Sequence, residues 1–75
     1  MNNAPFVPEG IPPMRVGTAA RVLGFDTLKV RDWTRSGRLL SVQAYEGANR
    51  YVTAEALAHF ASIHGILPRW EEAFQ

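Results

Sequence analysis

The chain has 75 residues, of which 47% are hydrophobic and none is cysteine, so we expect one small domain with no disulfide and no thiolate metal site. Its apolar runs are far shorter than the roughly 18 residues of a membrane span and its N-terminus lacks a signal-peptide pattern, so we expect a cytoplasmic protein without membrane contact. The net charge of +1 is unevenly distributed, because residues 15–50 carry seven Lys and Arg against three Asp and Glu, a local charge of +4 that favours a polyanionic partner.

The N-terminal segment, residues 1–14, is predicted to be an extended arm. It contains four prolines in its first thirteen residues, and each proline disfavours helical backbone at the residue before it. A first short helix should follow, because Val16, Ala20 and Leu23 are spaced for one helical face. Gly24 is expected to end that helix in a left-handed conformation.

A second helix is predicted over about 26–36, with Asp26 as its N-cap and Gly37 as its stop. At 100° per residue, Trp33 falls on one side with Val30, and we expect it to fill the core rather than to stack on a ligand. The opposite side carries Leu28, Arg31, Asp32 and Arg35. Asp32 is expected to pair with Lys29 or Arg35 on its own helix, and the alternative is acceptance of a hydrogen bond from cytosine.

A β-hairpin is predicted over about 40–52, because "LLSVQA" alternates apolar and polar residues and "RYV" is again β-prone. Thr53 should cap a third helix, "AEALAHFASIH", which Gly65 ends. The tail, residues 65–75, could form a short helical turn from Pro68 with Trp70 and Phe74 on one side. This segment is too short to stand alone, so it should cover the domain's own core or, alternatively, contact a partner.

The predicted order of helix, tight turn, helix, hairpin and helix over residues 15–64 suits a mainly α fold with a small β-hairpin. The stretch from Arg15 to Phe60 resembles the winged helix-turn-helix of the MerR superfamily, especially its small excisionase-like members. The resemblance rests on four spaced elements: a short helix ending in Leu-Gly, a capped helix with Trp33 near its end, the Gly-Arg-Leu at 37–39, and a hairpin closing with Arg50-Tyr51 before a final helix.

The resemblance implies sequence-specific binding to double-stranded DNA, in a small transcriptional regulator or an excisionase-type recombination directionality factor, with the protein expected at the nucleoid. The implied contact residues lie on the second helix and the wing: Thr27, Leu28, Lys29, Arg31, Arg35, Asn49 and Arg50. Arg31 is the best candidate for a bidentate guanine contact, whereas Lys29 and Arg35 suit phosphates. Arg50 could contact phosphate or anchor the hairpin to a helix.

Affinity for DNA should be modest. Where the family wing commonly has a histidine and a second arginine before Arg-Tyr, this chain has Gly47-Ala48-Asn49. Only eleven residues follow His64, so no effector domain or small-molecule pocket is expected. Cooperative self-association on DNA, or a larger DNA-bound partner such as a recombinase, polymerase or terminase, would then supply the missing affinity.

The sequence does not favour an enzyme, a metal site or a bound cofactor. His59 and His64 are five residues apart, about 140° around a helix, so they cannot share a metal ion as histidines four apart do. No phosphate-binding glycine loop is present. The competing hypothesis is a phage small-terminase-like DNA-recruitment domain or a protein–protein adaptor that uses the same fold.

Overall fold

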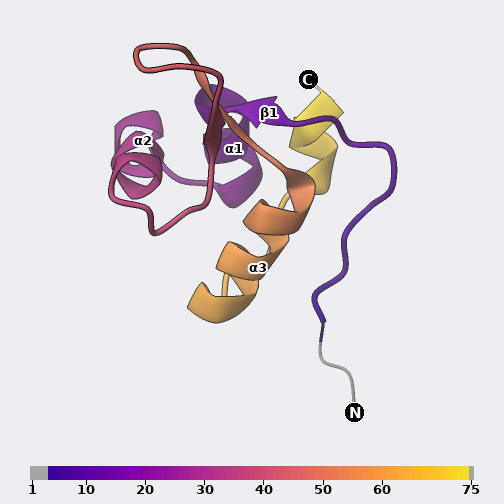
Figure 1. The fold of residues 1–75 in the computed structure, drawn as a ribbon. Coiled ribbons are helices and arrows are strands. Elements are labelled where there is room, and N and C mark those ends of the chain that lie inside the picture. The colour runs from indigo at the N-terminus through magenta and orange to yellow at the C-terminus, as the bar shows by residue number, and fades with distance from the viewer. Residues whose placement is uncertain (1–3, 75) are drawn as a thin grey trace.

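A computed structural model describes residues 4–74 as a small mixed α/β domain (Figure 1). In these residues three α-helices combine with a three-stranded antiparallel sheet and a terminal 3-10 helix. The elements in chain order are β1 (Met14–Arg15), α1 (Val16–Leu23), α2 (Thr27–Arg35), β2 (Val42–Gln43), β3 (Arg50–Val52), α3 (Ala54–His64) and η1 (Trp70–Phe74). Within this described range, none of the helices combines the length and the hydropathy that crossing a bilayer requires.

The helix ends follow the capping residues of the sequence, as predicted. The Asp26 carboxylate accepts a hydrogen bond from the Leu28 N–H at 3.2 Å and so satisfies one free donor of the first turn of α2. The Thr53 hydroxyl accepts the Ala56 N–H at 3.1 Å at the start of α3. Gly24 and Gly65 end α1 and α3 at φ values of 77° and 67°, a conformation that side chains with a Cβ rarely adopt.

The sheet contains a third strand outside the predicted hairpin. β1 pairs with β3, which also pairs with β2, giving the order β1-β3-β2. Met14 lies opposite Val52 and is only 5% exposed, so the last residue of the predicted arm belongs to the domain core. The arm therefore reaches only Pro13, and residues 1–3 of the predicted 1–14 segment lie outside the described part of the chain.

The alternating apolar residues around β2 face outward. Leu39 is fully buried, whereas Leu40 is 73% and Val42 60% exposed. Val42 lies opposite Tyr51 across the ladder, and Gln43 lies opposite Arg50, so successive side chains alternate between the two faces of the sheet. The half-buried Gln43 and Arg50 lie on the face that continues into the core.

The core lies where the helices meet the sheet, and its largest fully buried side chains are Leu39, Leu57, Val22, Val30 and Val52. Trp33 packs against this core but is half-buried rather than enclosed. Its ring centroid lies 5.2 Å from that of Phe25 and 4.9 Å from that of Phe60. Trp33 therefore lies on the core side of α2 as expected, but at the margin of the core rather than inside it.

The tail packs on its own domain. η1 contacts α1, and Ile66, Trp70 and Ala73 pack against the core cluster. The Arg69 N–H donates to the Val22 carbonyl at 2.7 Å, which attaches the tail to the C-terminal turn of α1. Phe74 does not share the buried side with Trp70, because it is 70% exposed.

Candidate functional site

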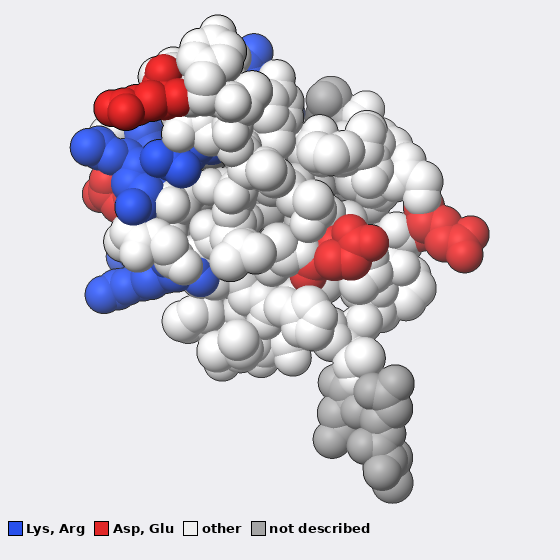
Figure 2. All heavy atoms as spheres, in the orientation of Figure 1, with Lys and Arg blue, Asp and Glu red and all other residues white. Residues whose placement is uncertain are grey.

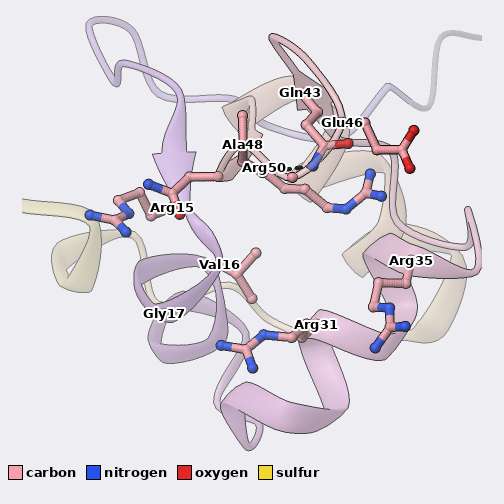
Figure 3. A pocket seen from close by; sticks show the side chains of 11 residues that line it. Arg15, Val16, Gly17, Arg31, Arg35, Gln43, Glu46, Ala48 and Arg50 are labelled. Carbon is pink, nitrogen blue, oxygen red and sulfur yellow. Dashed lines mark hydrogen bonds between the residues drawn. The ribbon is translucent and has the colours of Figure 1, made fainter.

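A concave groove lies between the start of α1, the outward face of α2 and the β2–β3 loop, residues 44–49 (Figure 3). Its volume is about 540 Å³. Four arginines from three separate elements line it: Arg15, Arg31, Arg35 and Arg50. The remaining lining residues are Val16, Gly17, Gln43, Glu46, Gly47, Ala48 and Asn49. We call this surface the arginine groove.

Secondary structure brings these four arginines together from distant parts of the sequence. Arg31 and Arg35 are one helical turn apart on α2, so both extend from the same side of that helix. Arg15 is the N-cap residue of α1 and stands in β1 opposite Tyr51. Arg15 in the edge strand β1 and Arg50 in the central strand β3 both line the groove.

Two hydrogen bonds hold the β2–β3 loop, and the groove-lining residues in it, in a defined conformation. The Gln43 side-chain amide donates to the Ala48 carbonyl at 2.6 Å, as drawn in Figure 3. The Ala48 N–H in turn donates to the Tyr45 carbonyl at 3.0 Å, closing a turn in which Gly47 adopts φ 91°. The loop therefore forms a defined wall of the arginine groove.

The four guanidinium groups are free to bind an external anion. Among residues 4–74, none of the four arginines forms an ion pair with another described side chain. Arg15, Arg31 and Arg35 are exposed and Arg50 is half-buried, while Glu46 is the one carboxylate among the described lining residues. Figure 2 shows Lys and Arg side chains gathered on one side of the molecule, with acidic side chains at the margin of that area. Each guanidinium offers five N–H donors in a planar arrangement that matches phosphate or carboxylate oxygens.

The structure brings together four of the seven residues that the sequence analysis singled out. Arg31, Arg35, Asn49 and Arg50 line the groove. Three others, Thr27, Leu28 and Lys29, lie in the first turn of α2, exposed and outside the lining.

The predicted pairing of Asp32 with a cation on its own helix is wrong. The Lys29 Nζ lies over the Trp33 ring, 6.0 Å from its centroid, which draws this cation toward the aromatic side of the helix. The expected ion pair of Asp32 with Lys29 or Arg35 is absent from the described chain. Arg35 lines the groove and Lys29 lies over Trp33, and neither of these two expected partners pairs with Asp32.

Arg15 is the arginine of the groove that sequence reasoning did not single out. The sequence marked it only as one of seven cations in the basic segment, because a two-residue strand leaves no recognisable pattern. The groove-lining residues Val16 and Gly17 follow it directly in the first turn of α1. Within residues 4–74, no group of three or more acidic or histidine side chains is placed to hold a metal ion.

Comparison with known proteins yields no match: no family model, no curated protein and no solved structure matches the chain. The resemblance to the MerR superfamily therefore rests on the sequence motifs alone.

Proposed function

We propose that this chain is a winged helix-turn-helix protein that binds double-stranded DNA through the arginine groove and the outward face of α2. In this arrangement α2 enters the major groove and the β2–β3 loop lies along the phosphate backbone as the wing. The observation that carries the proposal is the convergence of four arginines, without ion pairs in the described chain, on one concave surface. Phosphate contacts from such a surface supply the sequence-independent part of DNA affinity.

The residues of the groove divide into two roles. Arg31 lies in the middle of α2, exposed and about 100° around the axis from the buried Val30, and its guanidinium can donate to guanine O6 and N7 together. Arg35 at the end of α2 and Arg50 in β3 flank the loop and suit backbone phosphates, and Asn49 at the loop end offers a further donor. The anchoring alternative for Arg50 has less support, because no described carboxylate pairs with it.

The small size of the arginine groove limits the DNA affinity of a single copy of the protein. Four arginines and one opposing carboxylate provide few phosphate contacts, so a single copy should bind weakly at cellular salt concentrations. Self-association on adjacent sites, or tethering to a larger DNA-bound protein, raises the effective concentration and compensates. A small transcriptional regulator or an excisionase-type directionality factor fits these requirements.

The test is selection of a binding site from a random duplex pool, followed by affinity measurements on the enriched and a scrambled duplex. Arg31→Ala should cost about 1 to 3 kcal/mol on the enriched site and much less on the scrambled one. Arg38→Ala is the matched control, because Arg38 is exposed on the loop after α2 but does not line the groove. If no sequence is enriched and the wild type fails to bind any duplex, the proposal is wrong.

One observation favours the second candidate, an adaptor or small-terminase-like domain that binds protein. The outer face of the sheet is apolar around Pro13, Val42, Ala44 and Tyr51, and Leu40 beside it is 73% exposed. Exposed apolar patches of this kind are common at protein interfaces. Under this alternative, Val42→Ser would abolish partner binding while the groove variants would not.

A further inference from the structure

An exposed leucine stands at the start of α2, beside the arginine groove. Leu28 is 64% exposed, although it lies in a helix whose other exposed side chains are polar or charged. Its backbone is held in place, because its N–H donates to the Asp26 carboxylate that caps the helix. Leu28 is not part of the core cluster, so its side chain contributes little to the fold.

Helical geometry places Leu28 on the side of α2 that carries the groove arginines. Seven residues separate it from Arg35, which at about 100° per residue leaves an offset of only about 20°. Arg31 lies between them, about 60° from Leu28 around the axis and about 4.5 Å further along it. Leu28 therefore continues the Arg31–Arg35 face toward the N-terminus of the helix.

The positive charge of this helix face indicates which kind of partner Leu28 contacts. The arginine groove matches a polyanion, and a polyanionic surface offers few apolar groups to a leucine. In the major groove of DNA the apolar group that side chains contact is the C5-methyl of thymine. A leucine beside guanine-reading and phosphate-binding arginines therefore matches a methylated pyrimidine edge.

We propose that Leu28 is a specificity-determining residue that packs against a thymine methyl group, next to the guanine contacted by Arg31. This proposal rests on the DNA-binding function above and names the base feature that the first turn of α2 reads. The separation of about 4.5 Å between the two residues along the helix compares with about 3.4 Å between successive bases of one strand. The thymine and the guanine should thus lie within one or two base pairs of each other.

The test replaces single thymines of the enriched duplex by deoxyuracil, which keeps the base pair and removes only the methyl group. The wild type should bind one such duplex about fourfold more weakly, the effect of one apolar carbon returned to water. Leu28→Ala should bind the thymine and deoxyuracil duplexes equally. Leu67→Ala is the matched control, because Leu67 is 89% exposed and does not line the groove, and it should keep the wild-type discrimination.

The outcomes separate this inference from the function on which it rests. If the wild type binds no duplex, DNA binding itself fails. If it binds an enriched duplex but no thymine is sensitive to deoxyuracil, or if that duplex lacks thymine near the guanine, only the Leu28 inference is overturned. A folded Leu28→Ala variant that still discriminates between the thymine and deoxyuracil duplexes also overturns it, and Leu28 would then be a contact for a protein partner. Because Leu28 is exposed, its substitution should leave the melting temperature unchanged.

Discussion

Three of the groove arginines should each contribute one phosphate contact to the salt dependence of DNA binding. If the guanidiniums of Arg15, Arg35 and Arg50 each meet one phosphate, the slope of log affinity against log salt is about −0.9 × 3, or about −2.7. Raising the salt from about 50 to about 200 mM should then weaken wild-type binding about 40-fold. Changing one of these three arginines to Ala should reduce the slope to about −1.8 and the loss to about 12-fold, whereas Arg31→Ala removes a guanine contact and should leave the slope near the wild-type value.

The assay is fluorescence anisotropy of a labelled duplex, titrated with the wild type and each variant across that salt range. Two controls are built into the chain. Arg38→Ala should leave the slope unchanged, because Arg38 lies outside the groove lining. Glu46→Gln should tighten binding, because it removes the one carboxylate among the lining residues. A wild-type slope near zero, or arginine variants that all keep the full slope, would refute the assignment of phosphate contacts to this groove.

Three further predictions concern the scaffold that positions the groove. Trp33→Ala should lower the free energy of unfolding, measured by urea denaturation, by about 3 kcal/mol, which is the lower end for a large aromatic because the indole is half-buried. An unchanged urea midpoint would contradict its packing role. Asp26→Ala removes the N-cap of α2 and should cost about 1 kcal/mol in the same experiment, whereas an unaltered stability would show that the cap is dispensable. Deleting residues 68–75 removes the packing of Trp70 on the core and should lower the melting temperature by about 10 °C, while sedimentation should show no change in association state. An unchanged melting temperature together with lost self-association would instead mean that the tail contacts a partner.

Features fixed by local chemistry could be predicted from the sequence. Caps such as Asp26 and Thr53, and left-handed stops such as Gly24, act on their own helix turns, and the structure confirms them. The position of Trp33 followed from helical periodicity, because only one side of α2 can face the core. Periodicity also placed Arg31 on the outward side of the same helix.

Features that depend on pairing between distant segments could not be predicted. β1 exists because Met14 and Arg15 meet Val52 and Tyr51, nearly forty residues away, and nothing in two residues announces such a strand. Arg15 could therefore not be predicted from the sequence as a groove residue. Similarly, the sequence does not indicate which of the adjacent Leu39 and Leu40 is buried. The answer depends on where the chain leaves α2, because a shift of one residue along an extended chain moves each side chain to the other face.

The most direct test of DNA binding through the arginine groove is a map of backbone amide chemical shifts during titration with the enriched duplex. The largest changes should fall on groove residues from all three elements, including Gly17 in α1, Arg31 in α2 and Ala48 in the loop. The amides of Val42 and Ala44, on the outer face of the sheet, should change little. Saturating changes confined to that outer face, or none at the groove, would contradict the account.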